Sequence, residues 1–301
     1  MMDFIKTRKI FYVFSGIIII SSLLVIVIFG FKWGIDFTGG SLWEIEIPNL
    51  NTQTSQQILS FLNTQGIGQV TSQITSDKSL ILRFQNISEE KHQELLDSLK
   101  TQIISLEEKK FDSIGPAIGK ELIKKSLWAV ILVFAGILLY LTYAFRQASY
   151  NIPSYKYGFL AILALLHDLI FICGFLFLMG KIQGWELNSD FLVALLVVAG
   201  YSVHDTIVVY DRIRESLKMN SLKKNKIGQE SLGIIINTSI HQTLLRSLNT
   251  ALTTLFPLIA LYFVGPSSIK VLASSMTIGI IVGTYSSIFI ASALLYDWSK
   301  N

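Results

Sequence analysis

Long apolar runs separated by polar stretches dominate the pattern of this chain, and they predict six membrane-spanning helices. A helix that crosses a bilayer needs about 20 mostly apolar residues, because the hydrocarbon core is about 30 Å thick and each residue adds about 1.5 Å. Six stretches meet this requirement, namely residues 10–30, 126–145, 157–179, 191–210, 243–264 and 271–298. The pattern therefore indicates a polytopic α-helical membrane protein.

The first apolar run follows Lys6, Arg8 and Lys9, as the core of a secretory signal peptide would. The run is longer than a signal-peptide core, and no small-residue cleavage site is evident in the sequence after it. We therefore expect this run to be a retained membrane anchor.

Residues 31–125, between the first two runs, change their hydrophobic period between two and about 3.6, which predicts strands and helices. Trp43, Ile45 and Ile47 alternate with polar residues, as the buried side of a strand would. Ser88 is a suitable N-cap before two glutamates that suit the positive end of a helix dipole. The expected elements are a strand at 42–47, a helix at 56–62, strands at 69–74 and 80–84 joined by a turn at 76–78, a helix after 88 and a strand at 109–114. This β-α-β-β-α-β order is that of a ferredoxin-like split βαβ module, an α+β fold.

His92 is the one histidine of this segment, and it lies on a predicted helix rich in Glu and Lys. We predict that its side chain faces solvent. The segment shows no spacing of residues that would form a catalytic site, so its predicted role is contact with a partner protein. The chain is accordingly not predicted to be an enzyme.

Composition supports the membrane assignment, because 51% of the residues are hydrophobic and 15% are charged. Such a chain has too little polar surface for a soluble protein of 301 residues. The formal net charge of +4 is too small to indicate nucleic acid binding. Cys173 is the single cysteine and lies in an apolar run, which excludes an intrachain disulfide and a thiolate metal site. No metal and no cofactor are predicted.

The Lys and Arg residues of the short loops set the predicted orientation. With the N-terminus in the cytoplasm, the short outer loops hold only Lys181 and Lys270. The cytoplasmic side then holds Lys6, Arg8, Lys9, Arg146, Lys156, Arg212, Arg214, Lys218, Lys223, Lys224, Lys226 and Lys300. Both termini are therefore predicted to be cytoplasmic.

This orientation divides the chain into three predicted parts. Residues 1–30 are the cytoplasmic N-terminus and first transmembrane helix, and residues 31–125 are an extracytoplasmic ferredoxin-like domain. Residues 126–301 are a five-helix transmembrane domain with a basic cytoplasmic loop near 211–240.

Three charged residues lie at predicted membrane depth, and two of them follow a histidine: His167-Asp168, His204-Asp205 and Arg246. A charge at the bilayer centre costs about 2.5–3.5 kcal/mol on insertion scales, so it persists where it pairs, faces a bundle interior or has a function. Asp205 lies about 9 Å from the predicted cytoplasmic end of its helix. Arg246 lies at a similar depth in the next predicted helix, so we expect these two charges to pair.

Three interpretations of this pair remain open from the residues alone. A structural salt bridge would satisfy both charges and do nothing else. A proton relay would let Asp205 take up and release a proton under the influence of Arg246 and nearby histidines. A substrate-binding charge would need a polar cavity. His204 points about 100° away from Asp205 on the helix, and it is either a titrating group or a neutral donor to a neighbouring helix.

Small residues in the last apolar run predict close helix packing. Gly279 and Gly283 form a small-xxx-small face, which Ser286 and Ser287 extend.

Several motifs resemble those of a known family. They are residues 34–40 (GIDFTGG), Gly115-Pro116 with Gly119, His167-Asp168, residues 200–215 (GYSVHDTIVVYDRIRE), Arg246 with Thr250, Thr253 and Thr254, and residues 283–287 (GTYSS). One span, a large outer domain and five further spans resemble half of a resistance–nodulation–division transporter. Over nearly the whole chain, the motifs resemble the SecD/SecF family of protein-export membrane proteins, which belongs to that superfamily.

This resemblance implies an accessory subunit of the bacterial Sec translocon whose partners are SecD, the translocon channel and the translocating preprotein. With SecD it would use the proton motive force to assist preprotein translocation across the cytoplasmic (inner) membrane. Two alternatives stay open. A small-molecule or lipid exporter of the same superfamily would be indicated by a deep apolar pocket in the outer domain. A structural scaffold would need the membrane charges for stability alone.

The resemblance also implies roles for individual residues. It gives the coupling role to Asp205 and Arg246, and the depth of Asp168, His167 and His204 makes them further proton-coupling candidates. The residues of the family motifs are Asp36, Gly39, Gly40, Gly200, Thr206, Asp211 and Arg212. His204 stands where the family usually has Asn, which leaves proton and sodium coupling both open.

Overall fold

The computed structural model describes residues 3–30, 32–48, 50–74, 79–103, 105–146, 152–222 and 231–299. The predicted turn at 76–78 and four of the predicted cytoplasmic basic residues, Lys223, Lys224, Lys226 and Lys300, lie outside these ranges. The chain divides into two compact units. The helical unit comprises Met1–Lys32, Trp128–Trp185 and Asp190–Asn301, and the α+β unit comprises Trp33–Leu127 and Glu186–Ser189.

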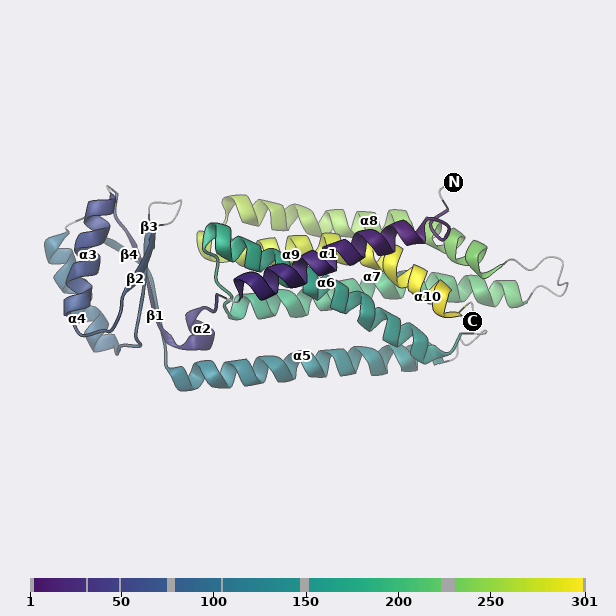
Figure 1. Ribbon diagram of the computed structural model, residues 1–301, viewed down its shortest axis with the longest axis horizontal. Helices are drawn as coiled ribbons and strands as arrows, with labels where there is room; N and C mark the ends of the chain where they lie inside the picture. Colours follow the sequence, from purple (N-terminus) through teal and green to yellow (C-terminus); the bar gives the residue numbers. More distant parts are fainter. Residues whose placement is uncertain are drawn as a thin grey trace. The chain divides into compact units, whose positions relative to one another are not determined.

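Six long apolar helices in the described ranges confirm the prediction of a polytopic helical membrane protein. The first five are α1 (Arg8–Phe29), α5 (Pro116–Ala144), α6 (Ser154–Gln183), α7 (Ser189–Ser221) and α8 (Leu232–Val264) (Figure 1). The sixth is continuous through α9 (Ser267–Tyr285), the π-helical turn η3 (Ser286–Ala291) and α10 (Ser292–Ser299). The side chains of α6, α7 and the sixth helix form most of the buried interior, whereas α1, α5 and α8 bury little.

The helix ends extend beyond the apolar runs, and this changes the predicted loop at 211–240. Helix α7 continues to Ser221 and α8 begins at Leu232, so much of that range is helical. Hydropathy locates only the apolar part of a helix, while good helix formers continue the helix into polar surroundings. Ion pairs at i, i+3 spacing support this extension, with Arg214 bonded to Asp211 at 2.7 Å and Arg212 to Glu215 at 2.5 Å.

Small residues allow the buried helices of the helical unit to approach closely. A Cβ atom at Gly283 would lie 3.1 Å from the Cβ of Ser202 in α7, and one at Gly279 would meet Val198 of the same helix. These contacts confirm the predicted small-xxx-small face. Helices α1 and α6 approach in the same way, because a Cβ at Gly174 would lie 2.7 Å from the Cα of Ser22.

The two ends of the chain meet at one ion pair. Arg8 of α1 donates from Nε to Asp297 of α10 at 2.9 Å, and the Tyr12 hydroxyl donates to the same carboxylate at 3.0 Å. The Arg8 guanidinium also lies over the Tyr296 ring, 4.9 Å from its centroid. These contacts hold α10 against the beginning of α1.

The α+β unit has the predicted ferredoxin-like order of elements. After the short helix α2 (Ile35–Thr38) come β1 (Gly40–Glu46), α3 (Thr52–Thr64), β2 (Thr71–Ile74), β3 (Ser79–Phe84), α4 (Glu89–Gln102) and β4 (Glu107–Ile114). The strands form an antiparallel sheet in the order β2-β3-β1-β4, and α3 and α4 cover one face of it (Figure 1). Trp43, Ile45 and Ile47 are buried as predicted and pack with Leu80, Leu82, Ile58 and Leu95.

Helix α4 begins at the predicted cap and carries a histidine that the prediction placed wrongly. Ser88 accepts a hydrogen bond from the Lys91 amide at 3.4 Å. His92 was predicted to face solvent, but 2% of its surface is exposed, because it shares a helix face with Leu95, Leu96 and Leu99.

The buried His92 ring contacts an aromatic ring and two glutamates. It stacks on Phe111 of β4 with centroids 3.6 Å apart, and its nitrogens contact Glu89 Oε1 at 3.2 Å and Glu108 Oε2 at 3.0 Å. The same Glu108 oxygen accepts from Trp43 Nε1 at 3.3 Å. The Gln93 amide, and after it the His92 ring, lower the pKa of the Glu89 carboxyl. His92 therefore joins α4 to β1 and β4.

Replacing Gly174 should separate α1 from α6. Gly174→Val places a branched side chain against the Ser22 backbone, and overpacking of this kind costs about 1–3 kcal/mol. We expect a lower temperature of half-loss in heated, detergent-solubilised protein analysed by size-exclusion chromatography. Gly16→Val on α1 is the control, since none of the described residues lies within 4 Å of a Cβ there. Equal heat resistance of the two variants would contradict the packing argument.

Replacing His92 should loosen the sheet of the α+β unit. His92→Ala removes the ring stacked on Phe111 and a partner of Glu108, a buried loss of about 2–3 kcal/mol. Hydrogen–deuterium exchange of the full chain should show β1 and β4 amides exchanging more than about tenfold faster, since tenfold corresponds to about 1.4 kcal/mol. Lys91→Ala, which removes only a surface pair with Glu94, should leave these rates unchanged. Unchanged exchange in His92→Ala would refute a structural role for this ring.

Candidate ion-coupling site

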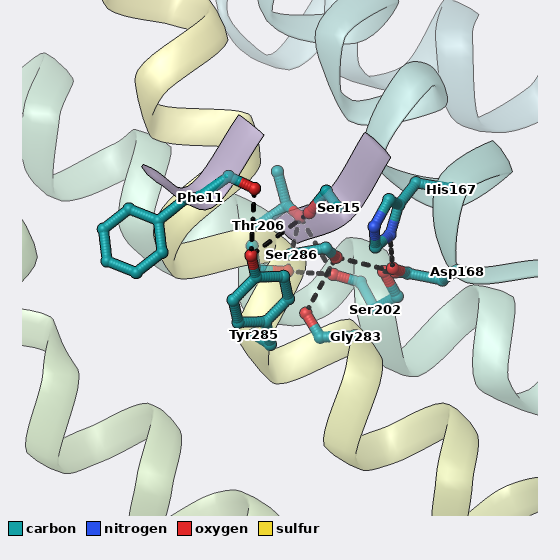
Figure 2. Close-up of polar contacts among 10 residues, drawn as sticks. Phe11, Ser15, His167, Asp168, Ser202, Thr206, Gly283, Tyr285 and Ser286 are labelled. Atoms are coloured by element: carbon teal, nitrogen blue, oxygen red, sulfur yellow. Dashed lines mark hydrogen bonds and ion pairs between the residues drawn. The ribbon is translucent and has the colours of Figure 1, made fainter. Parts of the chain in front are cut away.

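Asp168 of α6 is the centre of a buried polar network in the helical unit. Its carboxylate is fully buried and accepts hydrogen bonds at Oδ2 from Ser202 of α7 at 2.6 Å and from Ser286 of η3 at 2.8 Å (Figure 2). His167 Nδ1 lies 2.9 Å from Oδ1. A carboxylate that accepts from two hydroxyls and contacts an imidazole nitrogen can remain in an apolar interior at far lower cost than an isolated one.

Thr206 of α7 continues this network one turn along the helix. Its hydroxyl lies 2.8 Å from that of Ser287 and donates to the Ser202 carbonyl at 3.0 Å. Ser287 donates to the same carbonyl at 3.1 Å. We call His167, Asp168, Ser202, Thr206, Ser286 and Ser287 the Asp168 network; it joins three separate helices.

The π-helical turn η3 supplies two consecutive residues of this network. In an α-helix, neighbouring side chains diverge by about 100°, but a π-turn holds an extra residue and widens the backbone. Ser286 thereby reaches Asp168 while Ser287 reaches Thr206. The wider turn also places Ser292 Oγ 3.4 Å from the Ser287 carbonyl. π-Turns occur often at functional sites.

His167 lies at the edge of the Asp168 network, beside a second small group of hydroxyls. Its Nε2 atom is buried and has no hydrogen-bond partner among the described residues. The ring centroid lies 6.3 Å from that of Tyr285, whose hydroxyl is 3.1 Å from Ser15 Oγ of α1 and donates to the Phe11 carbonyl at 3.3 Å (Figure 2). The buried polar groups therefore extend from α6 to α1.

Asp205 lies one turn after Ser202 on α7 and differs from Asp168 in its surroundings. Only 2% of its surface is exposed, yet its Oδ2 atom accepts no hydrogen bond from any described residue. The hydroxyls of Ser247 in α8 and Thr284 in α9 neighbour this carboxylate, and the Tyr201 hydroxyl neighbours Thr284. These three buried hydroxyls are likewise without a hydrogen-bond partner within the described ranges.

Among the residues that the structure describes, Asp205 and Arg246 do not form the predicted ion pair. Within the described ranges no ion pair joins them, and the Arg246 side chain is exposed on α8 whereas Asp205 is buried. The reason is the direction of the side chains around α8. Ser247 points at Asp205, and Arg246, the residue before it, points about 100° away from that direction. The two residues lie at a similar predicted depth in the membrane, but their side chains are on helix faces that do not meet.

Unlike the buried Thr206, the candidates His204, Gly200, Asp211 and Arg212 of the 200–215 motif lie at or near the surface of this chain. His204 is exposed, and a Cβ at Gly200 would have none of the described atoms within 4 Å. Asp211 pairs with Arg214 of its own helix. Arg212 donates from Nε to Gln242 Oε1 at 2.6 Å and so links α7 to α8.

In the α+β unit, the motif at residues 34–40 packs against the motif at 115–119. Gly39 and Gly40 have φ angles of 75° and 125°, which favour glycine. A Cβ at Gly39 would lie 2.7 Å from the Cα of Pro116. Asp36 Oδ2 accepts from the Ser189 amide at 2.7 Å and from the Ser189 hydroxyl at 2.5 Å. The 34–40 motif therefore has a structural role: it packs against Pro116 and binds the first residue of α7.

Sequence reasoning placed Asp168 at membrane depth but missed its serine partners. Ser202 and Ser286 were noted as motif or small residues, and their signal was a hydroxyl at buried spacing on two other apolar runs. In the part of the chain that the structure describes, His, Cys, Asp and Glu nowhere gather in the groups of three that could hold a metal ion.

Comparison with known proteins places these residues in a family. Residues 94–301 match the profile described as "Protein export membrane protein SecD/SecF, C-terminal", and residues 24–46 match "SecD/SecF GG Motif". A curated relative from Thermobaculum terrenum, named "Protein translocase subunit SecF", is 40% identical over all of this chain and 95% of its own length. A relative of the same name from Anaerolinea thermophila is 35% identical over the same shares of the two chains.

Two solved structures of SecDF are similar to this chain. SecDF from Thermus thermophilus, described as a translocon-associated membrane protein, matches with a TM-score of 0.79 and 32% identity over the whole of this chain. SecDF in a super-membrane-facing form matches with a TM-score of 0.68 and 31% identity over 99% of this chain. Both are longer proteins, of which this chain spans 39%. The chain belongs to the SecD/SecF family of protein-export membrane proteins.

Proposed function

We propose that this protein is a non-enzymatic accessory subunit of the bacterial Sec translocon that, with SecD, uses the proton motive force to assist preprotein translocation. It works as a multi-pass protein of the cytoplasmic membrane, with both termini in the cytoplasm and the α+β unit outside. The observation that carries the proposal is the separation of its two membrane charges: Asp205 is buried inside the chain, and Arg246 is exposed on it.

The exposed side of α8 supports a membrane partner. Arg246, Asn249 and Thr253 recur at spacings of three and four, so they share one helix face, and all three are exposed. A charge that faces lipid near the bilayer centre costs about 2.5–3.5 kcal/mol or more. A second bundle with polar groups at this level removes that cost. SecD fits this requirement, because the family profile that this chain matches is shared by SecD and SecF.

The surroundings of Asp205 support ion binding. A buried carboxylate oxygen without a donor is costly, whereas a bound proton neutralises the charge and donates to a neighbouring oxygen. Ser247 and Thr284 supply such oxygens. Asp168, with its full set of donors, lacks this free oxygen, so Asp205 is the coupling carboxylate and the Asp168 network is its support.

The network gives a change at Asp205 a route to other helices. Asp205 follows Ser202 by three residues on α7, and Thr284 precedes Ser286 by two residues in the sixth helix. The same two helices therefore line both carboxylates, and a shift of α7 moves the donors of Asp168. The groove that the described residues of α3 and α4 form does not support the exporter alternative, because it is open and mixes amides such as Gln57 and Gln102 with Phe61.

Neutralising Asp205 should uncouple the complex without dismantling it. In vesicles containing the translocon, SecD and this protein, Asp205→Asn should abolish the stimulation of preprotein export by a proton gradient while the assembled complex is recovered in normal amount. Asp97→Asn, an exposed carboxylate on α4, is the matched control and should keep full stimulation. Persistence of stimulation in Asp205→Asn would refute the coupling role. Stimulation of the wild type by a sodium gradient alone would identify the other ion.

Removing the charge of Arg246 should weaken the contact with SecD. Loss of one partner of a buried charge pair costs about 2–5 kcal/mol, so Arg246→Gln should raise the dissociation constant for purified SecD in nanodiscs more than about tenfold. Leu245→Ala, a neighbouring exposed residue on another face of α8, is the control and should change it little. Unaltered affinity in Arg246→Gln would show that this face does not meet SecD.

A further inference from the structure

A short segment between α6 and α7 is built into the α+β unit. Residues Glu186–Ser189 follow α6 and lead directly into α7, yet they belong to the compact unit formed by Trp33–Leu127. The Leu187 carbonyl accepts from the Gly34 amide at 2.9 Å, and Leu187 forms a parallel bridge with Trp33. Leu187 is itself buried. We call these four residues the 186–189 segment.

An ion pair fixes the beginning of this segment. Arg83 of β3 donates from Nε to Glu186 Oε2 at 2.9 Å, and 6% of the Glu186 side chain and 19% of the Arg83 side chain are exposed. Surface ion pairs contribute little, but a buried carboxylate that loses its partner becomes an uncompensated charge. The Arg83 guanidinium therefore helps to hold the Glu186 carboxylate in its place.

Asp36 fixes the end of the segment at the first residue of α7. The first amides of a helix have no partner within the helix, and its N-terminus carries a partial positive charge. The Asp36 carboxylate meets both needs, because Oδ2 accepts from the amide and the hydroxyl of Ser189. Asp36 stands on α2, directly before β1 of the sheet.

The fit around the segment is too close for a side chain at position 34. A Cβ at Gly34 would overlap the Asn188 side chain. The contacts of the 186–189 segment therefore come from both the 34–40 motif and the sheet. They hold the start of the helix that carries Asp205, which follows Ser189 by 16 residues, or about 24 Å along α7.

We propose that Arg83 and Asp36 are positioning residues that anchor the start of α7 through the 186–189 segment, so that movement in the α+β unit is passed to the coupling helix and back. This inference rests on the proposed function, because it takes α7 as the helix that carries the coupling carboxylate. Since α7 is one continuous helix from Ser189 to Ser221, a displacement of its first residue is carried along the helix axis. The paired contacts of Arg83 and Asp36 hold the segment that ends at this residue.

Charge reversal tests the anchor with its own internal control. In vesicles containing the translocon and SecD, Arg83→Glu and Glu186→Arg should each lose most of the gradient-stimulated export, and the combined variant should regain it. Gradient-driven proton flux, followed with a pH-sensitive dye and normalised to the amount of complex, should persist in all three. Lys91→Glu, which reverses one charge of an exposed pair on α4, should behave as the wild type.

Several outcomes would overturn the anchor. They are full stimulation in both single variants, loss of flux in proportion to loss of stimulation, and a combined variant that assembles without regaining stimulation. If the single variants fail to fold, the gradient-stimulated export of the combined variant alone tests the anchor proposal. Different results would refute the proposed function: no gradient stimulation in wild-type vesicles, or stimulation that persists in Asp205→Asn. Because the anchor proposal rests on that function, these results would refute both.

Discussion

Hydrogen bonding to one buried carboxylate organises the interior of the helical unit. Asp168 is fully buried, and it is tolerated there because Ser202, Ser286 and His167 surround it. Each donor comes from a place that the rest of the fold must supply: α7 close to α6, and a π-helical turn in the sixth helix. Moving any of these helices leaves a buried carboxyl group unsatisfied, so the network specifies their arrangement as well as stabilising it.

Close packing and polar contacts work together along α7. Gly283 lets the sixth helix approach Ser202, and that approach brings Ser286 and Ser287 within hydrogen-bonding distance of the network. In lipid, where apolar surface gains little from association, such contacts are the main source of helix–helix specificity. Asp205, one turn away, is the exception, since its carboxylate has a free oxygen in the described part of the chain. A satisfied and an unsatisfied carboxylate thus share the same pair of helices.

Much of the fold was predictable from the sequence, because the period of apolar residues reports directly on burial. Trp43, Ile45 and Ile47 revealed a strand, and Gly279 with Gly283 revealed a packed face. Partners across helices were not predictable. The Asp205–Arg246 pair failed because depth along a helix says nothing about direction around it. His92 is buried despite its polar neighbours in the sequence, because its spacing to Leu95, Leu96 and Leu99 places it on the buried face of α4.

The π-helical turn has a consequence for the C-terminal end of the chain. It contains one residue more than an α-turn of the same rise would, so everything after Ser286–Ala291 is rotated by about 100° relative to an uninterrupted α-helix. Asp297 faces Arg8 and Tyr12 only in the rotated register. One inserted residue therefore determines both the position of the two serines at the centre of the bundle and the ion pair that joins α10 to α1.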